Sequence, residues 1–192
     1  MPLSPPCPRE HIHTRVVECR GYLRTDGLWD VEGHITDVKT YAFTSEFRGE
    51  VSAGMPVHDM WLRLTVDDRL TIHEVEAVTD AAPYSVCPAA AETFRRLKGL
   101  DIRAGFRKRI RELIGGTEGC THLLELLGPI ATTAYQTVYP YRERRRAERQ
   151  AVKTARAKGR KPSLIDSCHA FASDGEVVKR YWPEFYTGDE RG

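Results

Sequence analysis

The chain has 192 residues, of which 41% are hydrophobic, which is enough for one sizeable core and too many for a disordered chain. No apolar run approaches the roughly 20 residues that a membrane helix needs, and the first residues lack the apolar region of a signal peptide. We therefore expect a cytoplasmic protein with no membrane partner. The five cysteines are odd in number and widely spaced, which predicts core residues, metal ligands or nucleophiles rather than a disulfide framework.

The net charge of +2 hides an uneven distribution. Residues 141–161 contain ten Lys or Arg and two Glu, a local charge of +8, which leaves about −6 for the rest of the chain. The segment has only a thin stripe of alanines, so we expect a solvated basic helix over 141–162. Nucleic-acid binding is one use of such an arm, but no recognition motif accompanies it. Docking on an acidic body, its own or that of another subunit in a homodimer or larger homo-oligomer, is the expected alternative to a solvated face.

Four strands are predicted after a proline-rich leader, residues 1–14. Apolar and polar residues alternate over 16–24, 28–43, 57–66 and 70–79, and short turn signals separate these stretches. Asp37 and Lys39 interrupt the apolar side of the second strand. We interpret them as a surface pair, with the lip of a site as the alternative. His11 and His13 share one side of the extended leader, where we expect solvated side chains, the alternative being a metal pair or a substrate grip.

Three helices are predicted after the strands. Pro88 suits the first turn of one helix, a second begins near Asp101, and the third opens at Cys120. The pattern therefore predicts an α+β fold: a four-stranded antiparallel meander followed by three helices packed on one face, all within a core domain of residues 15–140. The apolar and aromatic tail, residues 163–192, is expected to dock on this body or on a neighbouring subunit.

The most informative stretch is a glycine-bearing loop, residues 115–119, that leads into a helix with Cys120 and His122 at its entry. A helix N-terminus favours the thiolate form of cysteine, which binds metals and attacks electrophiles. Cys87 lies at another predicted helix entry, and Asp80 precedes it in the same loop. Our leading hypothesis is a zinc or iron site built from Cys87, Cys120 and His122, with Asp80 as fourth ligand or as partner of a ligand. The alternative is that both cysteines are small buried hydrophobes and that His122 caps the helix.

A second hypothesis is a metal-free lyase, isomerase or hydrolase that acts on a small, partly apolar substrate. Cys120 or His122 would serve as nucleophile or base, and Asp80 would orient the imidazole. The side chains expected to bind a substrate carbonyl or carboxylate are Tyr84, His34 and Arg20. No nucleotide cofactor is indicated. A further pair in the tail, Cys168 and His169, could close the same site or belong to none.

Two resemblances follow from these residues. From Met60 to Tyr139, the order of strands, cysteine loop and helices resembles the iron–sulfur cluster scaffolds IscU and SufU and the related SufE fold. That resemblance implies that Cys87 and Cys120 meet at one end of the sheet, where Asp80 or His122 completes a tetrahedral ligand set. Most of residues 15–140 also resembles a bacterial family of unknown function, DUF2889, which implies no established activity. This second resemblance rests on four segments, Cys19–Tyr22, Asp26–His34, Thr79–Tyr84 and Gly119–Leu123.

Overall fold

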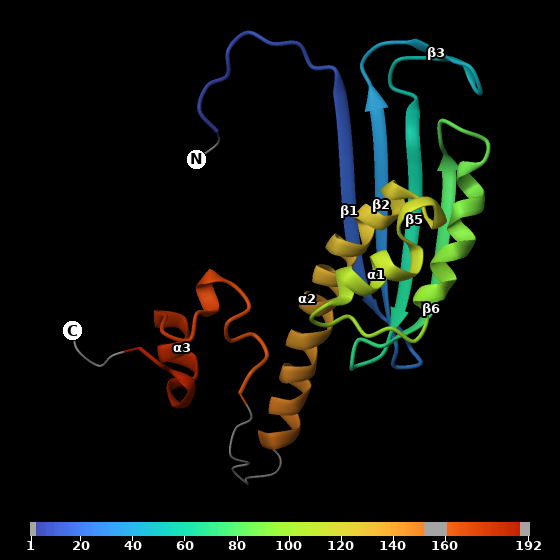
Figure 1. Cartoon of the computed structure of the whole chain (residues 1–192). Coiled ribbons are helices and arrows are strands. Elements are labelled where there is room, and N and C mark those ends of the chain that lie inside the picture. Colours follow the sequence, from blue (N-terminus) through green and yellow to red (C-terminus); the bar gives the residue numbers. More distant parts are fainter. Residues whose placement is uncertain (1–2, 152–160, 189–192) are drawn as a thin grey trace. The chain divides into compact units, whose positions relative to one another are not determined.

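Four long strands form an antiparallel sheet in the order β1-β2-β5-β6 (Figure 1). The structure is a computed structural model that describes residues 3–151 and 161–188, and the chain divides into two compact units, Met1–Ala147 and Glu148–Gly192. The strands of the sheet, all in the first unit, are β1 (His13–Leu23), β2 (Trp29–Lys39), β5 (Pro56–Val66) and β6 (Ile72–Ala81). The predicted four-stranded meander and α+β class are therefore confirmed.

A small hairpin interrupts the meander between β2 and β5. It consists of β3 (Phe43–Ser45) and β4 (Gly49–Val51), which pair only with each other. The sequence predicts no strand between residues 43 and 57, because this stretch lacks a run of alternating apolar residues. The hairpin extends beyond the ends of β2 and β5 (Figure 1), and at its base the Gly54 amide donates to the Lys39 carbonyl.

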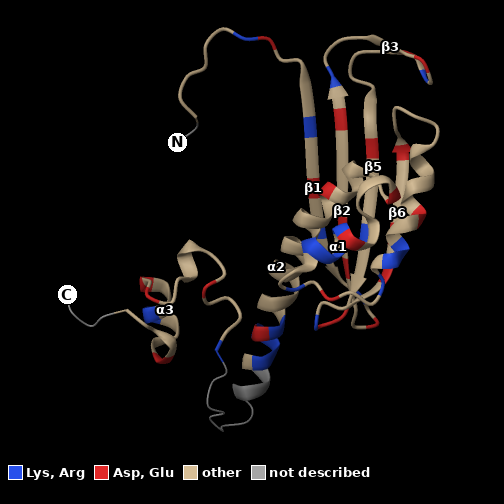
Figure 2. Ribbon diagram, in the orientation of Figure 1, with Lys and Arg blue, Asp and Glu red and all other residues tan. Residues whose placement is uncertain are grey.

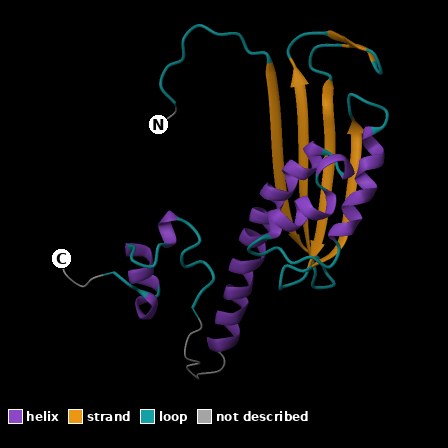
Figure 3. Ribbon diagram, viewed as in Figure 1, coloured by secondary structure: helices purple, strands orange, loops and turns teal. Residues whose placement is uncertain are grey.

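The helices of the first unit follow the sheet and lie on one of its faces (Figure 3). They are the 3₁₀ helix η1 (Cys87–Leu97), α1 (Phe106–Ile114), the short η2 (Gly116–Glu118) and the long α2 (Thr121–Ala151). The second predicted helix begins later than Asp101, at Phe106. α2 continues through Pro129 and Pro140, so that the core helix and the start of the basic segment form one element. The remainder of the expected basic arm, residues 152–160, lies outside the described residues.

The core lies between the sheet and these helices. Alternate residues of β2 are buried from Trp29 to Asp37, and the matching positions of β5 from Met60 to Val66 are buried beside them. The helices contribute a large apolar set, and burial of each such side chain stabilises the fold by about 1.5–3 kcal/mol. The helical core residues are Phe94, Leu97, Phe106, Ile110, Ile114, Leu123, Leu126, Leu127, Ile130, Ala134 and Val138.

Two glycines of the sheet allow α2 to lie close to it. A methyl group at Gly33 of β2 would lie 2.7 Å from Ile130 Cδ1, and one at Gly21 of β1 would collide with the Thr137 side chain. Gly21 and Gly33 lie on neighbouring strands under helix positions about two turns apart. Any larger residue at Gly33 would therefore displace α2 or force the Ile130 side chain into another rotamer.

The second unit contains short elements: η3 (His169–Phe171), α3 (Glu176–Tyr181) and η4 (Pro183–Phe185). Ile165 and Val178 are buried within it, and the rings of Phe171 and Trp182 lie 6.0 Å apart. The Asp166 carboxylate accepts from the Ser173 amide and from Lys161 Nζ. The apolar residues of the tail thus form a small cluster of their own, while its docking on another surface stays a prediction.

Candidate functional site

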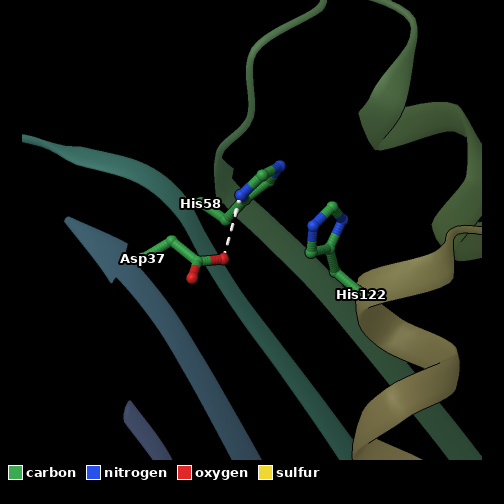
Figure 4. Close-up of side chains that lie close together, drawn as sticks. All are labelled: Asp37, His58 and His122. Atoms are coloured by element: carbon green, nitrogen blue, oxygen red, sulfur yellow. Dashed lines mark hydrogen bonds and ion pairs between the residues drawn. The ribbon is translucent and has the colours of Figure 1, made fainter. Parts of the chain in front are cut away.

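Two neighbouring strands and one helix bring three polar side chains together. Asp37 follows Trp29, Val31 and Ile35 on the helix-covered face of β2, and the strand register places His58 of β5 directly opposite it. His122 is the second residue of α2, which begins above this end of the sheet. Figure 4 shows the three side chains converging between the strands and the helix.

The Asp37 carboxylate is almost fully buried, with 1% of its side chain exposed, and all its hydrogen bonds come from charged or imidazole donors. Oδ1 accepts from Arg15 Nε (2.8 Å) and from His13 Nε2 (2.9 Å). Oδ2 accepts from Arg15 Nη2 (2.9 Å) and from His58 Nδ1 (3.0 Å). Asp37 was expected to belong to a surface pair. Its burial contradicts that expectation.

The electrostatics of the cluster fix the charge on Asp37. Burial alone raises the pKa of a carboxyl group, but the hydrogen bonds from Arg15 and His13 outweigh it and lower the pKa of Asp37 to about 2. Asp37 is therefore ionised at neutral pH. The Arg15 guanidinium also donates to Glu125 Oε2 of α2, so it links the edge strand β1 to both the site and the helix.

The two imidazoles are stacked, with ring centroids 3.7 Å apart. Burial lowers the pKa of His58 below its ordinary value of 6.5, and the neighbouring His122 lowers it further. Burial and the Arg15 guanidinium lower the pKa of His122 in the same direction. Both rings are therefore neutral at pH 7, and a neutral ring has a nitrogen lone pair available for a metal or a proton.

These three residues have the composition of a metal site. One ligand atom from each of Asp37, His58 and His122 can be chosen so that all lie within 4.8 Å of one another. Two imidazoles and one carboxylate bind zinc in catalytic centres and iron in non-haem centres. In the part of the chain that the structure describes, no other group of three or more such side chains gathers as closely.

The predicted pair at the helix entry lies beside this cluster. Cys120 Sγ is 4.0 Å from His122 Nδ1 and 3.9 Å from Met60 Sδ, and the residue is partly buried. The structure thus places Cys120 next to the imidazole, as expected from their spacing. Cys120 is not one of the three residues whose ligand atoms converge.

The other residues expected at the site are not part of this cluster. Cys87 is partly buried at the start of η1, and Asp80 is exposed near the end of β6. Neither belongs to a metal-ligating group of three among the described residues. Tyr84 is exposed in the loop between β6 and η1, where its ring meets that of Phe47 at 5.3 Å.

The remaining substrate-binding candidates lie on the opposite face of the sheet. His34 alternates with the buried residues of β2, so it points away from the helices, donates to Asp59 Oδ1 and stacks on Trp61. Arg20 of β1 lies on that same side, as its register with Glu32 requires, and pairs with Glu18. His11 bonds Thr14 and the His13 carbonyl, and only His13 of that pair contacts the Asp37 carboxylate.

Sequence reasoning missed His58 and placed Asp37 at a site only as the alternative to a surface pair, although a signal was present. Each continues the apolar side of a strand with a polar side chain: Asp37 follows Ile35, and His58 precedes Met60. A buried polar residue at such a position requires partners. Two such positions on strands that pair would have indicated a shared cluster.

Comparisons with known proteins place the chain in a family without assigning an activity. No curated protein and no solved structure matches it. None of its helices, within the described residues, is long and apolar enough to cross a membrane. The model of a family described as a protein of unknown function, DUF2889, matches residues 13–136, a range that includes every residue of the cluster around Asp37. The chain therefore belongs to the DUF2889 family.

Proposed function

We propose that this protein binds one divalent metal ion, zinc or iron, through Asp37, His58 and His122. The observation that carries the proposal is the convergence of their ligand atoms within 4.8 Å. The ligand set differs from the one that spacing suggested, because Asp37 and His58 take the places of Cys87 and Asp80. Cys120 stands beside His122 as a neighbour of the metal.

The protonation states of the three side chains support metal binding. Metal ligands must be deprotonated, which usually makes binding compete with protons. Here the pKa of Asp37 is about 2, and the pKa values of His58 and His122 are both lowered. The 3.0 Å gap between Asp37 Oδ2 and His58 Nδ1 is now bridged by a proton. A metal ion held by these two atoms would replace that proton, while Arg15 and His13 would keep their bonds to Oδ1.

The same geometry favours a catalytic ion over a structural one. Three protein ligands leave a coordination position for water or substrate, whereas structural zinc sites use four. The Arg15 guanidinium offsets the charge of Asp37, which weakens the attraction for the ion and strengthens that for an anionic substrate group. A bound ion would supply Lewis-acid activation of a carbonyl or of water. We therefore assign the protein to small-molecule hydrolases, lyases or isomerases.

Elemental analysis of protein purified without a histidine tag tests this proposal. We expect about one equivalent of zinc or iron per chain, and losses of at least about tenfold in occupancy for His58→Ala and His122→Ala. His34→Ala is the matched control, because His34 also pairs with an aspartate and stacks on a ring but lies on the other face of the sheet. Cys87→Ser and Cys120→Ser should keep the metal. A wild-type protein that binds neither ion, with the circular dichroism of a folded chain, would overturn the proposal.

One observation favours a second candidate, a metal-free reaction by acid–base or nucleophilic catalysis. His58 Nδ1 donates to Asp37, which leaves Nε2 as the unprotonated nitrogen, and Cys120 Sγ lies 4.0 Å from His122 Nδ1. A thiol beside an imidazole, here Cys120 beside His122, is the pair that forms an activated cysteine nucleophile, and His58 is a separate imidazole that Asp37 orients as a base. A thiol reagent should then label Cys120 faster than the other cysteines, and the advantage should disappear in His122→Ala. Equal labelling of all five cysteines would remove this candidate.

A further inference from the structure

The face of the sheet opposite α2 is uncovered by any helix of residues 3–147. Its residues alternate with the core positions of the strands, and several apolar side chains among them are exposed. Val16 is 52% exposed, Tyr22 43%, Val78 40% and Trp61 37%. Trp61 and Val78 are neighbours across β5 and β6, whereas Val16 and Tyr22 lie toward the two ends of β1. Exposed apolar surface bordered by charges is a feature of interaction sites.

The uncovered face carries an excess of negative charge. It presents three arginines against six carboxylates, an excess of three negative charges. The arginines are Arg20, Arg24 and Arg63, and the acidic residues are Glu18, Asp30, Glu32, Asp59, Glu74 and Glu76. Glu74 and Glu76 are the most exposed of the acids, with 66% and 63% of their side chains accessible.

A shallow hollow lies at the centre of this face. Glu32, Trp61, Arg63, Glu76 and Val78 line it together with Leu62. Arg63 donates to both glutamates, and one side of the Trp61 ring is covered by the stacked ring of His34. Arg63 stands between the two glutamates in the strand register, so the hollow keeps one net negative charge. The partly exposed Trp61 ring beside it offers a guanidinium or ammonium group a cation–π contact in addition to this charge.

The chain supplies a matching positive surface on α2. Four arginines, Arg142, Arg144, Arg145 and Arg146, follow Tyr141 and are exposed, and with Glu143 they give an excess of three positive charges. Figure 2 shows the corresponding blue positions of the ribbon toward the end of α2. The sequence continues basic to Lys161, so that the whole segment carries +8.

A single copy cannot bring these two surfaces together. α2 packs on the covered face of the sheet, where Ile130 lies over Gly33 and Thr137 over Gly21. The arginines continue the same helix beyond Tyr141. The centroid of the Tyr141 ring lies 5.0 Å from that of the Trp29 ring. A continuous helix does not turn back around the sheet to its other face. The positive surface of α2 can therefore meet the uncovered face only of a second copy.

We propose that the protein self-associates by docking residues 142–146 of one copy on the uncovered sheet face of another. The arginines of the helix pair with Glu74 and Glu76, and one guanidinium enters the hollow beside Trp61. This interface uses none of the residues around Asp37, so its test does not depend on whether the proposed metal binds.

Light scattering and sedimentation of the full chain at low and high salt test the proposal. We expect concentration-dependent association that weakens as salt rises, because exposed charges are screened beyond about 8 Å at physiological ionic strength. Glu74→Arg with Glu76→Arg, and separately Arg145→Glu with Arg146→Glu, should each weaken association by at least about tenfold through like-charge contacts. All four substitutions in one chain restore opposite charges between copies and should recover the association.

Matched charge reversals elsewhere provide the control. Arg95→Glu with Lys108→Glu changes two exposed charges on η1 and α1, and should leave association unchanged. A protein that stays monomeric at low salt would refute the proposal, as would association that is indifferent to both reversals. Salt-dependent binding of a DNA or RNA oligonucleotide to the arginines, without self-association, would instead assign the basic segment to nucleic acid.

Discussion

Asp37 and His58 face each other across β2 and β5, and His58 Nδ1 donates to Asp37 Oδ2 over 3.0 Å. The pairing joins a fully buried carboxylate to an imidazole that stacks on His122. Because the donor is Nδ1, the tautomer of His58 is fixed and its Nε2 carries the lone pair. Pairing between β2 and β5 therefore fixes the tautomer of His58, and α2 supplies the second imidazole, His122.

Replacement of Asp37 by Asn should destabilise the fold. The change removes the negative charge that Arg15, His13 and His58 share, and it leaves a buried amide that cannot accept all their hydrogen bonds. Arg15 is partly exposed, so we expect a loss of about 2 kcal/mol rather than the larger cost of a fully buried pair. Urea unfolding measures it. The control is Asp59→Asn, which removes a carboxylate that pairs with His34 at a more exposed position and should cost less than about 1 kcal/mol.

Acid should remove the contribution of Asp37. Its pKa in the folded chain, about 2, lies below the ordinary value of 3.8, so the folded state favours the ionised form. This stabilisation is complete above pH 4 and is lost as the pH falls toward 2, and it amounts to about 2 kcal/mol. Unfolding free energies measured from pH 5 to pH 2 should fall less steeply in Asp37→Asn than in the wild type. Parallel curves for the two proteins would contradict the assignment.

The two histidines should give a second pH dependence at milder acidity. Their pKa values are lowered in the folded chain, so the fold favours the neutral rings, and stability is lost as the pH falls below the ordinary value of 6.5. In His122→Gln, the pKa of His58 should rise, because the charge of His122 is one cause of its depression. NMR titration of the imidazole protons measures this shift. His73→Gln, at an exposed ring that pairs with Asp67, should leave the pKa of His58 unchanged.

Gly33→Ala should weaken the packing of α2 on the sheet. The new methyl group would lie 2.7 Å from Ile130 Cδ1, which forces a shift of the helix or a strained rotamer and costs about 1–3 kcal/mol. Ile130→Ala removes the Cδ1 and Cγ1 atoms that the new methyl group would meet. The double variant should therefore be more stable than the sum of the two single effects predicts. Simple additivity in chemical denaturation would show that the helix does not rest on Gly33.

Local patterns in the sequence were enough to predict the architecture. Alternation along β2 and β5 identified the strands, and the entry residues Cys120 and His122 marked the start of α2. The β3–β4 hairpin was missed because its strands are short and lack an apolar period. The late start of α1 has a local cause: Ile102 donates to the Leu70 carbonyl, which holds residues 101–105 against the end of the sheet.

The site was only half predictable, for a reason that lies in strand register. His122 and Cys120 are neighbours in sequence, so spacing alone indicated that they lie together. Asp37 and His58 are brought together by pairing between β2 and β5, which a sequence does not specify to the residue. His34 shows the opposite case. It was expected to bind substrate, but it is one residue away from the buried Ile35 on β2, so its side chain lies on the opposite face of the sheet.

The glycines beneath α2 have a consequence beyond packing. Ile130 lies about 12 Å further along the helix than His122, yet its contact with Gly33 sets how far the whole helix stands above the strands. The separation between His122 and the strand residues Asp37 and His58 is therefore adjusted at a distance, by a residue that touches none of them. Side-chain size at position 33 acts as a spacer, through which the dimensions of the cluster can be tuned while every ligand is kept.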